Sequence, residues 1–350
     1  MTTPSSYIFL SDPSSDTVKV FDSNGNYLQN LTAPDPVTVG SAIGPDGLAI
    51  GADKNLYVGT ILDHSVLKFN PTNGQYLGTF VTSGEHGLGS ATDIKFGPNG
   101  DLYVSNFASF AGFEPNSAPI IDPSKTDNVL VFSPTGQYLK TLNLPDGGAQ
   151  VPLGLTFITN PTNGHSELLA SARGGTYNDI NGGMTTINGN AIYSFDLATG
   201  ATGTVFASGG QLDGPAGLSV GPNNLLYVSS LDNDKILTYN LNGTFNSTIN
   251  SNTLPAIDGP TTQVFSPDNQ EIVTTGFNSA NAAIFNSNGT LNNLFIPVGG
   301  TPTLGFVKNS GALWVTPADI GGFVVPEPLN ILGAATVVML VTFVKTKLKK

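Results

Sequence analysis

Aspartate and asparagine side chains recur at two kinds of position, at or just before the start of apolar runs and just after the end of others. The first group is Asp46, Asp93, Asp213 and Asp258, and the second is Asp12, Asp63, Asn106 and Asp232. Ca²⁺ takes about six to eight oxygen ligands of this kind. If the fold gathers both groups at one end, they predict a calcium site, structural or catalytic. The alternative is that these side chains cap the backbone of their own turns.

The basic side chains offer fewer candidates. His64, His86 and His165 lie in segments expected to be loops, and no serine or acid stands at motif spacing from them. His64 is the candidate base at a channel mouth, and the alternative is a solvated loop histidine. Arg173, the only arginine in the chain, is the candidate ligand-binding cation because a guanidinium can bind a carboxylate with two hydrogen bonds. The alternative for Arg173 is a surface ion pair.

These positions belong to a repeating unit of four short apolar runs. Its clearest copy spans residues 212–249, where Gly, Pro, Asn and Asp separate the runs, and such runs predict antiparallel strands joined by tight turns. The second run recurs as Ile8–Leu10, Leu56–Val58, Leu102–Val104, Leu168–Ala170, Leu226–Val228, Ile272–Thr274 and Leu313–Val315. Four strands at a period of about 40–50 residues predict an all-β chain, a β-propeller of four-stranded blades.

The number of blades depends on how the two ends of the chain meet. The chain enters on a second-type strand, Tyr7–Leu10, and five full repeats follow, with first strands near Leu48, Ile94, Leu155, Leu218 and Val264. We expect Thr303–Val307 to supply the missing inner strand of the N-terminal blade and to close a ring of six blades. Closure of this kind removes a bare sheet edge. Because Ala312–Thr316 then competes with Tyr7–Leu10 for one place, a ring of seven blades is the alternative.

Two connections between second and third strands are much longer than the others. They span Asn106–Asn128 and Arg173–Asn190 in consecutive repeats. In an up-and-down blade this connection lies on the same face as the entry to the first strand, where the two acidic groups also lie. Long insertions that gather on one face indicate where a propeller binds. We therefore predict a binding surface on that face.

Composition excludes some classes of function. The formal net charge is −12, with 25 acidic and 13 basic residues, and four of the basic residues are Lys345, Lys347, Lys349 and Lys350. The part of the chain before these four lysines is therefore more acidic than the whole. Such an acidic domain repels phosphate backbones, so we expect no nucleic-acid partner. The chain contains no cysteine, which rules out a disulfide framework and a thiolate metal site.

The C-terminal segment differs from the repeats. Residues 329–344 carry no charge and are followed by the four lysines. Sixteen uncharged, mainly apolar residues with snorkelling lysines predict a transmembrane helix whose basic end is cytoplasmic. The alternative is a terminal helix packed on the propeller. The predicted organisation is therefore a propeller at 1–320, a linker at 321–328, and a membrane helix with a basic tail at 329–350.

Pro326, Glu327 and Pro328, followed by that apolar segment and basic end, resemble the PEP-CTERM sorting signal of Gram-negative bacteria, in wording closest to cyanobacterial versions. The resemblance implies recognition by an exosortase-type membrane enzyme, cleavage near Pro-Glu-Pro, and delivery to the cell surface or extracellular matrix. Such proteins carry an N-terminal signal peptide, and residues 1–6 show neither a charged nor an apolar leader region. We expect the true start to lie upstream of Met1.

The body resembles NHL-repeat proteins and, more loosely, the SMP-30/gluconolactonase and streptogramin-lyase propellers. The segments that carry this resemblance are Gly44–Ile50 followed by Leu56–Val58, together with Val18–Gly25. Such propellers include binders and hydrolases, and in lactonase-type members a bound metal polarises a carbonyl. We expect a non-enzymatic binding or interaction role with a protein or carbohydrate surface ligand. The alternative is a Ca²⁺-dependent lactonase-like or lyase-like enzyme that uses the acidic face.

Overall fold

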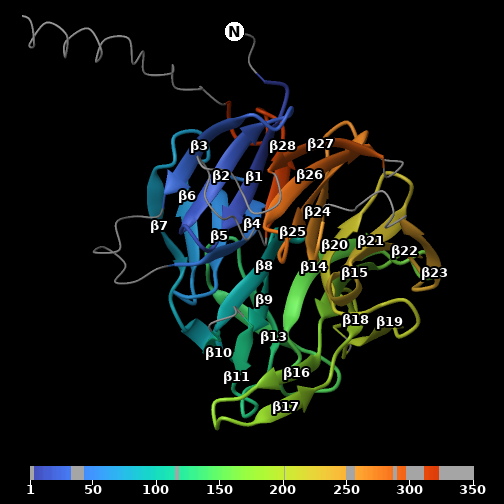
Figure 1. Ribbon diagram of the computed structural model, residues 1–350. Helices are drawn as coiled ribbons and strands as arrows, with labels where there is room; N and C mark the ends of the chain where they lie inside the picture. The colour runs from blue at the N-terminus through green and yellow to red at the C-terminus, as the bar shows by residue number, and fades with distance from the viewer. Residues whose placement is uncertain are drawn as a thin grey trace, which may run out of the picture.

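The computed structural model describes residues 4–32, 43–114, 118–200, 202–249, 257–286, 290–296 and 311–322. Within these residues, six four-stranded antiparallel sheets and two two-stranded hairpins account for 28 strands. The sheets follow one another around a ring, as Figure 1 shows, and this arrangement is a β-propeller. Apart from strands, the described residues contain two 3₁₀ turns, Glu85–Gly87 and Leu231–Asn233.

Each sheet is one blade, in which the strands are ordered from the inner to the outer position. Blade 1 contains β28 (Ala312–Val315), β1 (Tyr7–Asp12), β2 (Thr17–Asp22) and β3 (Tyr27–Thr32). Blade 2 contains β4 (Pro45–Ile50), β5 (Leu56–Thr60), β6 (Val66–Phe69) and β7 (Tyr76–Val81). Blade 3 contains β8 (Ser90–Phe96), β9 (Leu102–Phe107), β12 (Asn128–Phe132) and β13 (Tyr138–Asn143).

The other three blades follow the same plan. Blade 4 contains β14 (Pro152–Thr159), β15 (Ser166–Ala172), β18 (Ala191–Asp196) and β19 (Thr204–Ser208). Blade 5 contains β20 (Pro215–Val220), β21 (Leu225–Ser230), β22 (Lys235–Asn240) and β23 (Phe245–Ile249). Blade 6 contains β24 (Pro260–Phe265), β25 (Glu271–Gly276), β26 (Asn281–Asn286) and β27 (Leu291–Ile296). The predicted repeats therefore correspond to whole blades.

Closure of the ring differs from the prediction in one strand. Strand β28 pairs with β1, with Leu313 opposite Phe9 and Ala312 opposite Leu10. The interpretation of Leu313–Val315 as a second-type strand was wrong, because this segment is the inner strand of blade 1 and neighbours Tyr7–Asp12 without competing with it. Thr303–Val307, the segment expected at that place, lies outside the described residues. Both ends of the described chain thus meet in one sheet.

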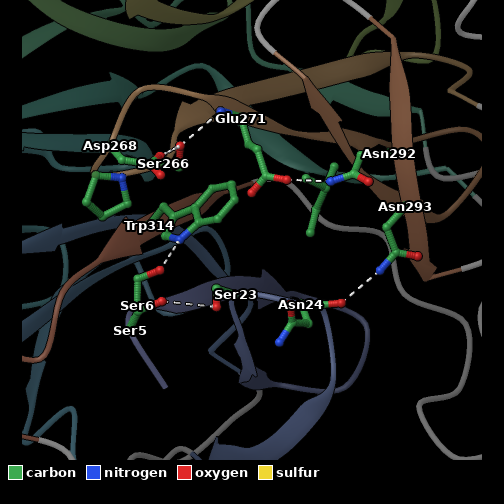
Figure 2. Close-up of a pocket in the computed structure, with 12 residues that line it drawn as sticks. Ser5, Ser6, Ser23, Asn24, Ser266, Asp268, Glu271, Asn292, Asn293 and Trp314 are labelled. Atoms are coloured by element: carbon green, nitrogen blue, oxygen red, sulfur yellow. Dashed lines mark hydrogen bonds between the residues drawn. The ribbon is translucent and has the colours of Figure 1, made fainter. Parts of the chain in front are cut away.

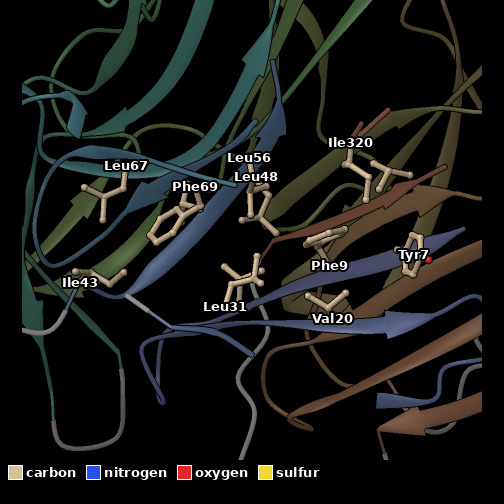
Figure 3. Close-up of a cluster of buried hydrophobic side chains, with 13 residues drawn as sticks. Tyr7, Phe9, Val20, Leu31, Ile43, Leu48, Leu56, Leu67, Phe69 and Ile320 are labelled. Carbon is tan, nitrogen blue, oxygen red and sulfur yellow. The ribbon is translucent and has the colours of Figure 1, made fainter. Parts of the chain in front are cut away.

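Alternation of side chains explains why the blades stack. Along β1, Tyr7 and Phe9 are buried against blade 2, whereas Ile8 and Leu10 are buried against blade 6. Neither face of the sheet is left for water, so the strand reads as a continuous apolar run. A separate apolar cluster fills each of the six junctions between neighbouring blades. Figure 3 shows the junction between blades 1 and 2, where Phe9 and Leu31 face Leu48.

The inner strands lie close together around the axis. Each contacts the next in the order β28, β4, β8, β14, β20, β24 and back to β28. A Cβ placed on Gly47 of β4 would lie 2.7 Å from both Cα of Asp93 and the main-chain N of Ile94 in β8. Gly154 and Gly217 in other inner strands, and Gly311 directly before β28, also face the backbone of the next blade. Glycine at this place permits close approach of two backbones.

We expect Gly47→Ala to lower the free energy of unfolding by about 1–3 kcal/mol, because the added methyl group overpacks against rigid backbone. Denaturant unfolding of the two proteins measures this difference. Gly183→Ala is the matched control, since its Cβ would meet as nearest atom the Asp179 carboxylate at 3.3 Å, which can move. Equal stability of Gly47→Ala and the unsubstituted chain would contradict the close packing of inner strands.

The two long connections each contain a hairpin. The first carries β10 (Phe110–Phe113) paired with β11 (Pro119–Ile121), and the second carries β16 (Gly175–Asn178) paired with β17 (Met184–Ile187). Both hairpins lie beside blades 3 and 4 (Figure 1). The prediction that these connections gather at one place is confirmed.

Of the predicted linker at 321–328, residues 323–328, with Pro326, Glu327 and Pro328, lie outside the described residues, and so does the predicted membrane helix with its basic tail at 329–350. The start upstream of Met1 also stays a prediction. Among the residues that the structure does describe, no helix is long and apolar enough to cross a membrane.

Candidate functional site

Strand direction defines two faces of the ring. Inner strands begin, and second strands end, on one edge of each blade, which we call the hairpin face because β10, β11, β16 and β17 follow second strands there. The opposite edge, where inner strands turn into second strands, is the turn face. The two predicted acidic groups lie on the hairpin face, as expected from the topology.

The two hairpins form one unit on the hairpin face. Ile121 of the first hairpin bridges to Asp179 of the second, and the amide of Ile180 donates to the carbonyl of Ile121 at 3.0 Å. The amide group of Asn178 donates to the Glu114 carboxylate at 3.1 Å. Beneath the unit, a buried cluster fixes it to blades 3 and 4: Phe107, Ile121, Ala149, Val151 and Tyr177. We call β10, β11, β16, β17 and their turns the hairpin unit.

Large apolar side chains remain exposed on this unit. Phe113 is 43 % exposed, Ile180 54 % and Met184 72 %. Phe113 packs edge-on against Phe110, with ring centroids 4.8 Å apart. Aromatic and methionine side chains on a supported surface are typical of protein interfaces. The hairpin unit therefore has the composition of a binding surface.

Aspartate and asparagine also join successive blades. In four blades, the residue just before the third strand accepts a hydrogen bond from the main-chain amide that leads into the next blade. The pairs are Asp16 with Gly44 at 2.8 Å, Asp127 with Gln150 at 2.7 Å, Asn190 with Gly214 at 3.0 Å and Asp234 with Gly259 at 2.7 Å. Three of these residues, Asp16, Asn190 and Asp234, have left-handed backbone angles, which Asp and Asn tolerate. No motif in the sequence marks this role.

Asp127 connects this joint to the hairpin unit. Its carboxylate accepts hydrogen bonds from the amides of Gln150 and Val151, and from the amide and hydroxyl of Ser109 at 2.7 and 2.9 Å. Burial raises the pKa of the Asp127 carboxyl, and these hydrogen bonds oppose that rise. The base of the first long connection is thus held to the entry of blade 4.

Arg173 begins the second long connection and pairs with Asp232 of blade 5. Its Nε lies 3.0 Å from Oδ2 of Asp232, and its second guanidinium nitrogen binds Oδ1. The guanidinium also lies over the ring of Tyr177, 5.9 Å from its centroid. The structure therefore shows Arg173 in an ion pair, the alternative to the predicted ligand-binding role. Through this pair Arg173 joins blade 5 to the hairpin unit.

Tyr177 gives this part of the molecule a dependence on alkaline pH. Burial raises the pKa of its phenol to about 12. Between about pH 10 and pH 12 the unfolded chain loses the proton while the folded chain keeps it, so stability falls as pH rises. The difference between this pKa and the ordinary value of about 10 corresponds to a loss of on the order of 2–3 kcal/mol in the free energy of unfolding. Denaturant unfolding on both sides of this range should show a smaller fall in Tyr177→Phe; an equal fall in both proteins would contradict this assignment.

The predicted calcium ligands are engaged with protein groups, mostly within their own blades. Asp12 binds Lys19, and Asp63 accepts from the Ser65 hydroxyl at 2.6 Å. Asp93 binds Lys95 at 2.9 Å and accepts from the amide of Leu155 at 2.8 Å. The remaining partners are Asn128 for Asn106, Asn190 for Asp213, Arg173 for Asp232 and Asn278 for Asp258. Asp46 is buried in β4.

These residues do not converge on one point. Asp213 and Asp232 come together beside Arg173, whereas the other members are spread over blades 1, 2, 3 and 6. Within the described residues, no group of three or more His, Cys, Asp or Glu side chains could hold a metal ion. The donor set there does not fit Ca²⁺, which needs several oxygens around one centre. The calcium site stays a prediction.

The histidines also act locally. His64 occupies a left-handed position on the hairpin face, and its Nδ1 is buried with no hydrogen-bond partner among the described residues. His86 stacks on Tyr138 with centroids 3.9 Å apart, and His165 lies 2.8 Å from Asp196 on the turn face. That hydrogen bond lowers the pKa of Asp196 to about 2. None of these contacts forms a nucleophile–base pair.

A second candidate site lies on the turn face, where blade 6 meets blade 1 (Figure 2). It is a cleft of about 500 Å³. Its walls come from the segment before β1, the β2–β3 turn, the β24–β25 turn and the starts of β25 and β27; the lining residues are Ser5, Ser6, Ser23, Asn24, Ser266, Pro267, Asp268, Glu271, Ile284, Asn292, Asn293 and Trp314. No motif marks these residues, because they come from opposite ends of the sequence.

Comparison with solved structures agrees with the fold. A chain of a nidogen/laminin complex matches with a TM-score of 0.60 at 13 % identity, covering 89 % of this chain and 98 % of that one. A catalytically inactive virginiamycin B lyase from Staphylococcus aureus, solved with quinupristin, matches at 0.53 and 14 %, covering 84 % and 86 %. A gluconolactonase from Xanthomonas campestris matches at 0.50 and 16 %, covering 78 % and 84 %.

At these identities the likeness shows the β-propeller fold alone. The matched structures include a binding complex and two enzymes, so the fold does not choose between the two roles. No family model matches the sequence, and no curated protein matches it either.

Proposed function

We propose that this chain is a non-enzymatic binding protein of the cell surface or extracellular matrix, and that it presents the hairpin unit to a partner. The observation that supports this proposal is the joining of two long connections, from two blades, into one hydrogen-bonded unit with exposed Phe113, Ile180 and Met184. Loops held by a rigid scaffold are where propellers place binding residues. The partner is a protein with an apolar surface.

Delivery to the surface rests on the C-terminal segment. Pro326, Glu327 and Pro328, the apolar residues and the lysines resemble a PEP-CTERM signal, whose partners are the membrane and an exosortase-type enzyme. The described chain leaves blade 1 on the turn face, where Ile320 is buried in the cluster between blades 1 and 2. The last described residue, Gly322, follows blade 1 on this face, so an anchor in the residues beyond it would join the propeller on the side opposite the hairpin unit. This geometry supports presentation of the unit to an outside partner.

Binding of the labelled, purified chain to the surface of source cells that lack it tests this role. We expect Phe113→Ser/Ile180→Ser/Met184→Ser to raise the Kd for the cell surface by about tenfold, which corresponds to about 1.4 kcal/mol. The matched control is Leu77→Ser/Leu139→Ser/Phe245→Ser, since these residues are 44–48 % exposed on outer strands away from the hairpin unit. Equal binding by the hairpin variant and the control would reject the proposal.

The alternative of a Ca²⁺-dependent lactonase-like or lyase-like enzyme makes a different prediction. It requires stoichiometric Ca²⁺ uptake in calorimetry and lactone turnover that Asp232→Ala abolishes. We expect neither, because Asp232 is bound by Arg173 and, within the described residues, no three acidic or histidine side chains are grouped so that they could hold a metal ion. Stoichiometric uptake with turnover would establish the enzyme.

A further inference from the structure

The cleft between blades 1 and 6 has the size of a ligand site. Its volume of about 500 Å³ falls within the range of small-molecule sites, about 300–1,000 Å³. Such sites are usually lined mainly by apolar side chains, but nine of the twelve residues in this cleft are Ser, Asn, Asp or Glu. A ligand that replaces water in this cleft must therefore offer many hydrogen-bonding groups, because unpaired polar groups would oppose its binding.

Charge restricts the ligand further. The lining residues include two carboxylates, Asp268 and Glu271, and no Lys, Arg or His. The hydroxyl of Ser266 donates to Asp268 at 2.6 Å and lowers the pKa of this carboxyl, so it stays ionised at neutral pH. Phosphate, sulfate and carboxylate ligands would meet negative charge without a basic partner. The ligand is therefore not an anion.

The polar groups are held in place before any ligand arrives. Asn292 donates to Oε1 of Glu271, and Figure 2 shows the Glu271 carboxylate between Trp314 and Asn292. Asn293 donates to the carbonyl of Asn24 across the junction at 2.8 Å. Side chains fixed by such bonds lose little rotamer freedom on binding. Ionised carboxylates accept strong hydrogen bonds from hydroxyl groups.

Trp314 supplies the apolar part of the wall. Its indole N–H donates to the Ser6 hydroxyl at 2.8 Å, and 9 % of the residue remains exposed. Since its polar atom is already bonded, the ring offers the ligand an apolar surface. An apolar ring edge beside carboxylates and amides suits a molecule with hydroxyl groups around an apolar carbon ring.

From these four observations we infer that the cleft binds a neutral saccharide, a pyranose or a short oligosaccharide of pyranoses. The carboxylates of Glu271 and Asp268 accept its hydroxyl protons, Asn292 and Asn293 orient those groups, and Trp314 lies against its C–H surface. This site is separate from the hairpin unit, because it lies on the opposite face. The inference and the proposed protein-binding role can thus fail independently.

Trp314 makes the test direct because it is the only tryptophan in the chain, so tryptophan emission reports on this cleft. The full chain is titrated with neutral disaccharides (cellobiose, maltose and lactose), with galacturonic acid as the anionic probe and with CaCl₂. We expect a saturable change in emission with at least one neutral disaccharide and none with galacturonic acid. Glu271→Gln and Asn292→Ala should each weaken that binding by about tenfold or more, the effect of losing one hydrogen bond to a charged group.

Glu114→Gln is the matched control, because Glu114 also accepts from an asparagine amide but lies on the hairpin unit. It should leave saccharide affinity unchanged, and thermal unfolding verifies that each variant is folded. The inference is overturned by no emission change with any neutral disaccharide up to tens of millimolar, by an equal response to galacturonic acid, or by a response to CaCl₂ alone. It is also overturned if folded Glu271→Gln and Asn292→Ala both bind as tightly as Glu114→Gln.

Discussion

Trp314→Ala should lower the free energy of unfolding by about 3–5 kcal/mol, because truncating a buried tryptophan leaves a cavity. Trp314 lies in β28 and packs in the cluster that joins blades 6 and 1, with Ile8, Val273 and Ile284. The loss falls on the junction between blade 6 and blade 1, and blade 1 is the sheet in which the two ends of the described chain meet. Denaturant unfolding followed by circular dichroism measures it.

Two further variants separate the causes of this loss. Trp314→Phe keeps most of the volume but removes the hydrogen bond to Ser6, so we expect a loss of only about 1–2 kcal/mol. Phe245→Ala, on the outer strand of blade 5 and 47 % exposed, should cost less than Trp314→Ala. If Trp314→Ala is no more destabilising than Phe245→Ala, β28 does not close the ring.

Lys19→Met should be destabilising by about 3–5 kcal/mol, because it leaves the Asp12 carboxylate buried without its counter-ion. The two groups are 2.7 Å apart, and their side chains are 2 % and 0 % exposed. The hydroxyls of Ser15 and Thr17 bind the same lysine at 3.0 and 3.2 Å. Chemical denaturation at neutral pH measures the difference.

Lys68→Met is the control for this prediction. Lys68 pairs with Asp53 at 2.6 Å, but their side chains are 28 % and 40 % exposed, and such surface pairs contribute about 0–1 kcal/mol. The double variant Lys19→Met/Asp12→Asn should be more stable than Lys19→Met, since the unpaired charge is gone. A similar effect of Lys19→Met and Lys68→Met would show that the blade 1 pair is solvated.

The period of the repeats predicted the blades correctly because each blade buries both faces and each strand is an apolar run between turn residues. The same regularity misplaced Leu313–Val315. Its Leu-Trp-Val sequence has the same apolar–aromatic–apolar order as the Leu-Tyr-Val of second strands. The two kinds of strand look alike because both are buried on two faces. Periodicity reports burial, and it does not report which neighbour a strand pairs with. The pairing of β28 with β1 depends on a contact about 300 residues away in sequence.

The candidate sites were predictable to different degrees. Loop length alone located the hairpin unit, because an insertion is visible without its structure. The acidic residues were placed on the correct face, but Asp16, Asn190 and Asp234 show that Asp and Asn side chains in turns can also join neighbouring blades. The cleft between blades 1 and 6 could not be predicted from the sequence, because Ser6, Glu271 and Trp314 meet only after the ring closes.

The central claim is that the two ends of the propeller meet in one sheet, and an engineered disulfide tests it most directly. The chain has no cysteine, and Leu10 lies opposite Ala312 in the antiparallel pair, at a Cα separation of about 4.5–5.5 Å that a disulfide can span. We predict that Leu10→Cys/Ala312→Cys forms this bond on mild oxidation and becomes more resistant to denaturant than its reduced form. Two thiols that stay free and reactive in the folded, oxidised protein would contradict the closure.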